Sequence, residues 1–582
     1  MYILGLSCFY HDSAICLLKD GIPVAAVDEQ SFTRKKHDSS FPVQAIRWAL
    51  KREGIDFSAI EAVAFYEKPL VKFERILKSH VANFPKSFTQ FVKGMPSWFN
   101  TKLRLDKLLV KEFGYKGPIC YGDHHRSHAA SCFYASGWEK SSILTVDGVG
   151  EWSTATWGLG EGSKIHLHKE IRFPHSLGLL YSAFTYYLGF KVNSGEYKVM
   201  GLAPYGEPKY VDRIKQLIDI REDGSFRLNM KHFCFDYGMR MYLPSFEEVM
   251  GQPTRPMNSG ELPLFYKDVA RSLQEVVNEV MCKLATTIVQ ETGETKLCMA
   301  GGVALNCVAN GQIIRNTPVT ELFVQPAAGD NGGAMGAALW LWHEVLNKER
   351  SWRMNTPYLG PEYSDEFIES TLKKYNAVYT KLSREELLNQ TTDLLKDSLV
   401  VGWYQGRQEW GPRALGHRSI LGDPRHPEMR EIINMKIKMR EGFRPFAPSV
   451  IEEDSQKYFD LKQKSPYMLL VAPVQDEVQN GETPLPSITH VDGSARVQTV
   501  NSDQEPLYYE LLQTFKKKTG CSVLINTSMN VRGEPIVNTP EDAYRCFMRT
   551  EMDGVVLGSF LLHKKDQPAI DLKSAQEEFG LD

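Results

Sequence analysis

One pattern of short strands and polar loops occurs twice in this chain, and it constrains the fold more than any other feature. The apolar runs that predict the strands are residues 2–7, 14–18 and 24–27 in the first copy and residues 142–146 and 154–160 in the second. In each copy a polar loop, at residues 9–13 or 147–151, separates the first two strands. The chain therefore contains a candidate internal duplication.

A duplicated strand–loop–strand unit, each half followed by helices, is how the sugar kinase and actin-like α/β fold is built, with the two polar loops facing each other across a cleft. Two unrelated hairpins would give the same pattern, so the repeat favours this fold without requiring it. Residues 347–361 have charge, Pro and Gly but no periodicity, which predicts a domain boundary. In a chain of 582 residues we expect a first domain at 1–350 and a second, α/β domain at 361–582.

A long helix is predicted in the middle of the chain. Apolar residues recur at helical spacing from Val269 to Ile288. Asp268 stands where an N-cap would, and Gly293 stands where the helix would end. We expect this helix to belong to the scaffold.

Composition narrows the function. Lys and Arg total 68 against 71 Asp and Glu, a net charge of -3, and 42% of the residues are hydrophobic. This balance is typical of an ordinary soluble globular protein, so we expect neither a nucleic-acid partner nor a membrane partner. Ten Cys residues are scattered without a C-x-x-C pair, and the sequence has no signal-like segment and no apolar run of about 18 residues. We therefore expect a reducing, cytoplasmic location.

Two histidines and two aspartates form a candidate metal site. His124 and His128 are four residues apart, so a helix would place both imidazoles on one face. Asp147 and Asp330 each stand where an apolar strand ends in a glycine-containing loop, the position where α/β folds gather ligands. Two imidazoles and two carboxylates suit iron, manganese or zinc. Histidines that only pack in the core or cap a helix are the alternative explanation.

Basic residues gather in the predicted second domain, although the common phosphate-binding motifs G-x-x-x-x-G-K-[ST] and G-x-G-x-x-G do not occur in the sequence. These residues are Arg407, Arg413, Arg418, Lys438, Arg440 and Arg444. An arginine side chain can bind two phosphate oxygens at once. Because the chain as a whole is slightly acidic, this local concentration of basic residues favours a small polyanionic ligand over a solvated surface. Ser528, which follows the predicted strand 522–525, adds a hydroxyl group at a strand end.

Several longer motifs follow one another along nearly the whole chain. They are G-L-S and H-D-S-A within residues 5–14, F-T-R-K-K-H at 32–37, N-S-G-E-Y-K-V-M-G-L-A-P-Y-G at 193–206, G-P-R-A-L-G at 411–416 and N-T-S at 526–528. Through them the chain resembles the O-carbamoyltransferase family, which includes the nodulation-factor and antibiotic carbamoyltransferases, the tobramycin enzyme among them. His417 stands where Asn is expected in this family.

The resemblance implies an actin-like first domain that transfers a carbamoyl group beside a bound iron, and a YrdC-like second domain that uses ATP, with magnesium, to convert carbamoyl phosphate to carbamoyl adenylate. It implies His124, His128, Asp147 and Asp330 as metal ligands. It implies Arg413, Lys438, Arg444, Met468, Arg496 and Ser528 for the activation site. His11 and Lys36 would face the transfer site, with His11, beside Asp12, as the natural base for the alcohol proton.

The expected partners are therefore carbamoyl phosphate, ATP and a small hydroxyl-bearing acceptor, with a homodimer left open. Residues 73–111 and 219–262 are expected to shape the acceptor pocket. A tRNA threonylcarbamoyl-transfer protein is an alternative, but it should carry a basic surface, and the net charge of -3 argues against it. A nucleotide-gated binding protein is another, and the arginine-rich second domain argues against that.

Overall fold

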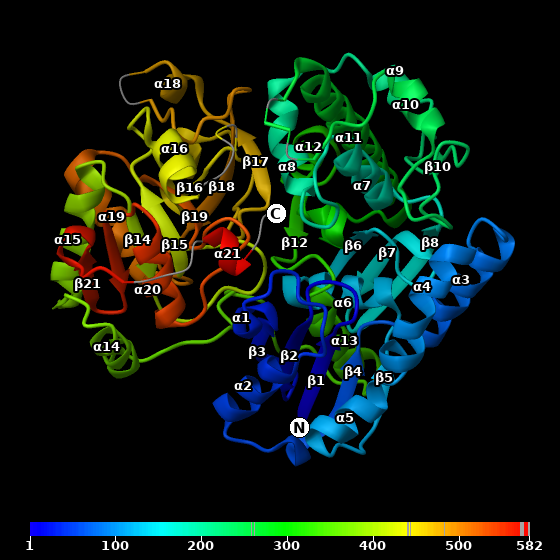
Figure 1. The fold of residues 1–582 in the computed structure, drawn as a ribbon, viewed down its shortest axis with the longest axis horizontal. Coiled ribbons are helices and arrows are strands. Elements are labelled where there is room, and N and C mark those ends of the chain that lie inside the picture. Colours follow the sequence, from blue (N-terminus) through cyan, green and yellow to red (C-terminus); the bar gives the residue numbers. More distant parts are fainter. Residues whose placement is uncertain are drawn as a thin grey trace. The chain divides into compact units, whose positions relative to one another are not determined.

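The chain folds into two compact units, and Figure 1 traces both of them. The computed structural model describes residues 1–257, 259–260, 262–438, 442, 444–481, 484–570 and 575–579. The first unit comprises Met1–Glu29 and His37–Met354, and the second comprises Gln30–Lys36 and Asn355–Asp582. A short piece of the N-terminal sequence thus belongs to the C-terminal unit.

The first unit contains two five-stranded sheets with the same topology. Their orders are β3-β2-β1-β4-β5 and β8-β7-β6-β11-β12. In each sheet the first three strands in sequence pair antiparallel and the remaining two add in parallel. The strands are β1 (Tyr2–Ser7), β2 (Ala14–Lys19), β3 (Ile22–Asp28), β4 (Ile60–Phe65), β5 (Ile119–Tyr121), β6 (Lys140–Val146), β7 (Ser153–Glu161), β8 (Lys164–Arg172), β11 (Lys296–Ala300) and β12 (Glu321–Val324). The predicted duplication and the predicted fold class are confirmed.

Two helices join the halves of this unit. Helix α6 (His124–Ser136) follows β5 of the first sheet but packs on β6 and β11 of the second, whereas α13 (Gly332–Trp340) follows β12 and packs on β1 and β2. The two helices also pack against each other, and Figure 1 shows them between the sheets. A Cβ on Gly336 would lie 1.8 Å from the carbonyl oxygen of Ser127, so only glycine allows the helices to approach this closely.

The remaining elements of the first unit surround this core. They are α2 (Val43–Glu53), α3 (Pro69–Ala82), α4 (Phe88–Ser97), α5 (Leu105–Phe113), α7 (Leu177–Tyr187), α8 (Glu196–Leu202), α9 (Val211–Ile214), the hairpin of β9 (Ile218–Ile220) and β10 (Phe226–Leu228), α10 (Pro244–Met250), α11 (Leu264–Thr292) and α12 (Cys307–Asn316). Within the described ranges, no helix is both long and apolar enough to cross a membrane.

Helix α11 is the long helix expected from the sequence. Gly293 ends it in the left-handed conformation, with φ 69°, as predicted. The predicted N-cap is wrong, because the helix already begins at Leu264 and Asp268 lies within it. The Asp268 carboxylate instead accepts a hydrogen bond of 2.8 Å from the backbone N–H of Glu207. It therefore fixes a neighbouring segment instead of the helix end.

The second unit is built on one nine-stranded sheet of order β13-β21-β20-β14-β15-β19-β16-β18-β17. Its strands are β13 (Thr380–Lys381), β14 (Val401–Tyr404), β15 (Arg418–Gly422), β16 (Ala447–Ile451), β17 (Leu470–Pro473), β18 (Ser494–Val500), β19 (Val523–Ser528), β20 (Gly554–Leu557) and β21 (Phe560–His563). Its helices are α1 (Gln30–Thr33), α14 (Asp365–Lys374), α15 (Arg384–Lys396), α16 (Met429–Ile432), α17 (Ser455–Tyr458), α18 (Asp476–Gln479), α19 (Pro506–Thr519), α20 (Pro540–Arg549) and α21 (Ala575–Phe579).

Arg34 fastens the N-terminal segment Gln30–Lys36 to this second unit. Its guanidinium donates to the Glu534 carboxylate at 3.0 Å and to the carbonyl oxygen of Ile536 at 2.7 Å. Glu534 is only 2% exposed, so this contact is a buried ion pair. The side-chain amide of Asn538 adds a bond of 3.0 Å to the carbonyl oxygen of Ser31.

The close approach of α6 and α13 predicts the effect of one added methyl group. Gly336→Ala should lower the free energy of unfolding of the first unit by about 1–3 kcal/mol, because its Cβ meets backbone that cannot rotate away. Gly94→Ala in α4 is the control, since its Cβ would meet nothing within 4 Å. That change should be neutral or stabilise by about 0.5–1 kcal/mol. Urea unfolding of both variants measures the difference, and equal stabilities would contradict the packing described.

Candidate metal centre and nucleotide site

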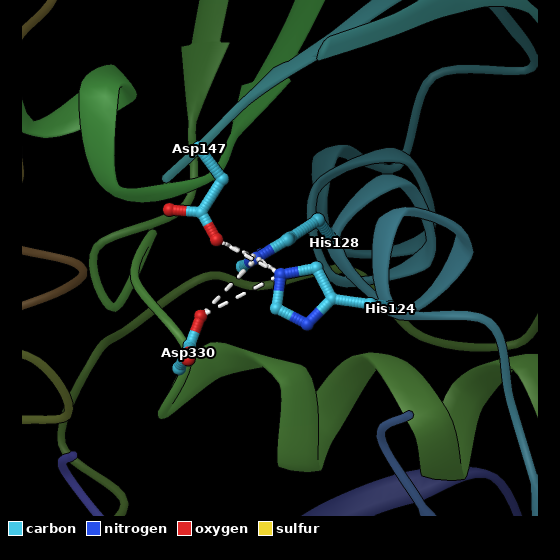
Figure 2. Close-up of side chains that lie close together, drawn as sticks. All are labelled: His124, His128, Asp147 and Asp330. Atoms are coloured by element: carbon cyan, nitrogen blue, oxygen red, sulfur yellow. Dashed lines mark hydrogen bonds and ion pairs between the residues drawn. The ribbon is translucent and has the colours of Figure 1, made fainter. Parts of the chain in front are cut away.

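Four predicted ligands come together in the first unit, as Figure 2 shows. His124 and His128 lie one turn apart on α6, Asp147 follows the last residue of β6, and Asp330 lies in the loop between β12 and α13. One ligand atom from each residue falls within 4.8 Å of all the others. The helical spacing and the two strand ends therefore produce the arrangement that the sequence predicted.

The distances indicate a shared centre. The Nε2 atoms of His124 and His128 are 3.1 Å apart, and Oδ2 of Asp147 lies 2.8 Å and 3.4 Å from them. Oδ1 of Asp330 lies 3.7 Å and 3.6 Å from the same two nitrogens. The side chains of both histidines are 1% exposed, that of Asp330 is 4% exposed and that of Asp147 is 13% exposed. Two nitrogen and two oxygen donors, largely withdrawn from water, fit a divalent transition metal.

Electrostatics also favour a cation here. Burial opposes the charge on His128, yet its contacts with Asp147 and Asp330 raise its pKa to about 9. Burial likewise opposes the charge on Asp147, but the two histidines hold the pKa of this carboxyl well below its usual range. The cluster thus holds a proton on His128 at neutral pH, and metal uptake would have to release it.

Neighbouring groups hold the ligands in place. Both carboxylate oxygens of Glu151 accept the backbone N–H of His124, each at 3.1 Å, which satisfies a donor at the N-terminus of α6. The backbone N–H of Gly302 donates to Oδ1 of Asp147 at 2.9 Å. Glu67 lies 3.9 Å from Nδ1 of His124. The sequence analysis did not identify Glu151 or Glu67; Glu151 stands in the second repeated loop, which is the signal that could have found it.

His125 is not part of the centre. Its Nδ1 lies 2.7 Å from the Thr145 hydroxyl and its Nε2 lies 2.8 Å from the carbonyl oxygen of Ser153. Burial lowers its pKa well below the usual value, and the nearby histidines add to this effect. It is therefore a neutral histidine that ties α6 to the second sheet.

The predicted base lies in the first polar loop of the first unit. Nδ1 of His11 is 3.3 Å from Oδ2 of Asp12, whose other carboxylate oxygen is 2.8 Å from Nδ1 of His37. Burial lowers the pKa of His11, but Asp12 and the charges of Asp330 and Asp147 outweigh it and raise this pKa to about 9. Lys36, predicted to act with His11, is the last residue of the segment that groups with the second unit.

In the second unit, Lys438 and Ser528 are in contact, at the end of β19. The Lys438 ammonium is 3.3 Å from the Ser528 hydroxyl, and it also donates to the carbonyl oxygen of Ser528. It is 2.7 Å from Oδ1 of Asn530, which the sequence analysis did not single out. Lys438 is 3% exposed.

The sheet register gathers most of the other predicted residues at the same edge. Asn526 pairs with Ala447. Ser449, two residues further along β16, pairs with Gln498, which is two residues beyond Arg496 in the parallel strand β18. Ser528 ends β19 two residues beyond Asn526, and Arg444 precedes β16 on the same side. Arg413 precedes β15, whose Ser419 pairs with Ser528. Met468 precedes β17, and the antiparallel pairing of Val471 with Arg496 directs it away from this edge.

Two of the predicted basic residues have a structural role. Arg418 is 0% exposed and donates to the carbonyl oxygens of Gly406 and Pro361 at 3.0 Å and 3.1 Å. Arg407 donates to the carbonyl oxygen of Leu359 at 2.6 Å. The prediction that these two residues bind phosphate is wrong, because their guanidinium groups already donate hydrogen bonds to backbone carbonyl oxygens. Arg440 lies outside the described residues.

His417, at the position where Asn was expected, is also structural. Its ring stacks on Tyr358 with centroids 3.7 Å apart, and its Nε2 lies 2.6 Å from a carboxylate oxygen of Glu505. Burial opposes its charge, but Glu505 raises its pKa above the usual value. This substitution keeps the loop before β15 in position.

Comparison with known proteins identifies similar sequences. A family model described as the carbamoyltransferase N-terminus matches residues 2–339, and one described as the carbamoyltransferase C-terminus matches residues 392–564. The chain is 51% identical to the uncharacterized protein sll1178 of Synechocystis, over 100% of both chains. It is 37% identical to the nodulation protein NolNO of Sinorhizobium fredii, over 96% of this chain and 79% of that one. It is 33% identical to 3'-hydroxymethylcephem-O-carbamoyltransferase of Streptomyces clavuligerus, over 50% of this chain and 53% of that one.

The geometry of the four-ligand cluster predicts that His128→Ala loses divalent metal. Removing one of four ligands should weaken binding by more than the roughly 10–100-fold that loss of an outer-shell partner costs. Elemental analysis of the purified protein, followed by titration with iron, manganese and zinc, measures this. His166→Ala, on the exposed edge of β8, is the control and should keep full occupancy. Full occupancy in the His128 variant would remove this residue from the ligand set.

Proposed function

The chain belongs to the carbamoyltransferase family, and from this premise we propose that it is an ATP-dependent O-carbamoyltransferase acting on a hydroxyl group of a small polar metabolite. The family establishes an enzyme that transfers carbamoyl groups. Oxygen as the accepting atom is supported by the cephem relative, whose name specifies an O-carbamoyltransferase. The observation that carries the proposal is that one unit brings together four side chains that could bind a metal, while the other places basic residues near one edge of its sheet.

The proposed reaction has two steps, and the two sites suit one step each. Carbamoyl phosphate releases phosphate to give carbamate, with uptake of one water, and the carbamate oxygen then displaces pyrophosphate from ATP. The product, carbamoyl adenylate, has a far better leaving group than carbamate. In the second step the acceptor hydroxyl oxygen bonds to the carbamoyl carbon, AMP leaves, and the hydroxyl proton is released to a base.

We assign activation to the basic edge of the second unit. Arg413, Arg444 and Arg496 can bind phosphate oxygens through charge-assisted bonds, which are strongest where water is excluded. Lys438 adds a compact positive charge beside the Ser528 hydroxyl. Met468 does not share this edge in the sheet register, so its predicted contribution rests on the family resemblance alone.

We assign transfer to the cluster in the first unit. His124, His128, Asp147 and Asp330 would hold a divalent metal, with iron as the expected ion. Such a metal polarises a carbonyl or an acceptor oxygen. His11 would accept the hydroxyl proton and Asp12 would orient its ring, as their 3.3 Å contact suggests. His11 needs its neutral form for this role. Burial lowers its pKa, while the hydrogen bond to Asp12 and the charges of Asp330 and Asp147 raise it to about 9, and a bound dication would offset the charges of Asp330 and Asp147.

The assignment of activation predicts a selective loss in the second unit. Arg444→Ala should lower pyrophosphate release from ATP and carbamoyl phosphate, measured without an acceptor, by at least about 100-fold, because alanine cannot replace charge-assisted bonds to phosphate. Its metal content should not change. Arg384→Ala, an exposed arginine of α15 in the same unit, is the control and should release pyrophosphate normally. Normal release by the Arg444 variant would contradict the assignment.

The assignment of transfer predicts the opposite selectivity. His11→Asn should still form carbamoyl adenylate, but carbamoylation of the acceptor should fall by roughly 100–10,000-fold, the usual contribution of a general base. His168→Asn, an exposed histidine of β8, is the control.

The acceptor itself can be found with the same pair of proteins. Incubating polar metabolite extracts with labelled carbamoyl phosphate should give a product heavier by one carbamoyl group with the unaltered protein but not with the His11 variant. We expect a sugar, aminocyclitol or similar polar alcohol. Label in tRNA instead would overturn this expectation in favour of a threonylcarbamoyl-transfer activity.

A further inference from the structure

Helices α3 and α4 of the first unit, with the residues that directly follow each of them, expose an unusual number of apolar side chains. Leu70, Leu77, Val81, Phe84, Phe88, Val92 and Phe99 are between 40% and 73% exposed, and we call them the α3–α4 apolar face. In Figure 1 these two helices lie along one outer side of the first unit, beyond β8 and β5. Single exposed apolar residues are normal, but large ones that recur on successive helical turns, as Leu77 and Val81 do on α3 and Phe88 and Val92 on α4, indicate an interaction surface.

The orientation of these helices is fixed by their opposite side. Lys72 of α3 is buried and forms an ion pair of 2.5 Å with Glu67. Arg75, also buried, lies over the ring of Phe173 at 4.7 Å. On the α4 side, Trp98 is 5% exposed. The polar and aromatic anchors therefore face the protein, and the apolar face is left toward solvent, which reverses the usual amphipathic arrangement.

The charge around this face selects the kind of partner. Between Lys68 and Lys111 the chain has ten Lys and Arg residues against two acidic ones, although its overall net charge is -3; two of the ten, Lys72 and Arg75, are buried on the opposite side of α3. Lys78, Lys86 and Lys93 are exposed among the apolar positions. A second copy of the same face would bring like charges together, which argues against self-association through it. An anionic partner would be attracted.

We propose that the α3–α4 apolar face binds the surface of an anionic lipid bilayer. Phenylalanine, leucine and valine side chains interleaved with lysine are the composition of helices that lie in the membrane interface, with apolar groups in the headgroup region and lysines on anionic headgroups. Binding is peripheral and does not depend on the proposed reaction. The net charge of the whole chain argued against a membrane partner, but it averages over this local excess of basic residues.

Vesicle co-sedimentation of the purified full-length protein tests the proposal. The protein should sediment with vesicles of phosphatidylcholine and phosphatidylglycerol and stay in solution with phosphatidylcholine alone. The double variant Phe84→Ser/Phe88→Ser should lower partitioning by about tenfold or more, since each ring loses its apolar contact. The double variant Lys86→Glu/Lys93→Glu should lower it at least as much, and added salt should weaken binding of the unaltered protein.

Matched changes on α14 of the second unit are the controls. Phe367 is 50% exposed and Lys373 is 65% exposed, so Phe367→Ser and Lys373→Glu alter the same residue types elsewhere on the surface and should leave vesicle binding unchanged. The proposal is overturned if the unaltered protein ignores anionic vesicles, or if the control variants lose as much binding as the α3–α4 variants. It is also overturned if sedimentation velocity shows that the unaltered protein is a dimer and the Phe84→Ser/Phe88→Ser protein is a monomer. In that case a second copy of the chain would cover the face.

Discussion

The packing of two carboxylates and two imidazoles within 4.8 Å is the constraint on which the first unit depends. Negative charge that is largely withdrawn from water is stable only if positive charge stands among it, either a proton on His128 or a metal cation. The elements around the cluster serve this arrangement: α6 presents both histidines, β6 ends just before Asp147, and α13 begins after Asp330. Gly336 matters for the same reason, because it lets α13 lie close enough to α6 for Asp330 to reach the histidines.

Much of the fold could be predicted because its signals are local. Strand-sized apolar runs separated by polar loops occur twice, and the structure turns them into two sheets of identical order. Gly293 ended its helix as expected because a left-handed helix end favours glycine. Helices α6 and α13 each pack on the sheet of the other half, and no sequence pattern within either helix indicates this. The role of Asp268 could not be predicted locally either, because its carboxylate accepts the backbone N–H of Glu207, which is far away in the sequence.

In the candidate site, too, local patterns could be predicted from the sequence and long-range contacts could not. Four-residue spacing and strand ends identified the four side chains that the structure brings together. They did not identify Glu151, which accepts the backbone N–H of His124, because composition says nothing of such contacts. Residue type alone misassigned Arg418, since a guanidinium satisfies backbone carbonyls as readily as phosphate. Averaging had a similar effect on charge: a net value of -3 concealed the basic segment that contains α3 and α4.

The return of Gln30–Lys36 to the second unit has a consequence for how such a gene can evolve. The chain passes between the units after residues 29, 36 and 354, so a single cut near residue 354 does not yield two self-sufficient pieces. A fragment beginning there would lack Arg34 and leave the buried Glu534 carboxylate without its cation, a defect of about 3–5 kcal/mol. Fission or shuffling of the C-terminal half would therefore require a new partner for Glu534.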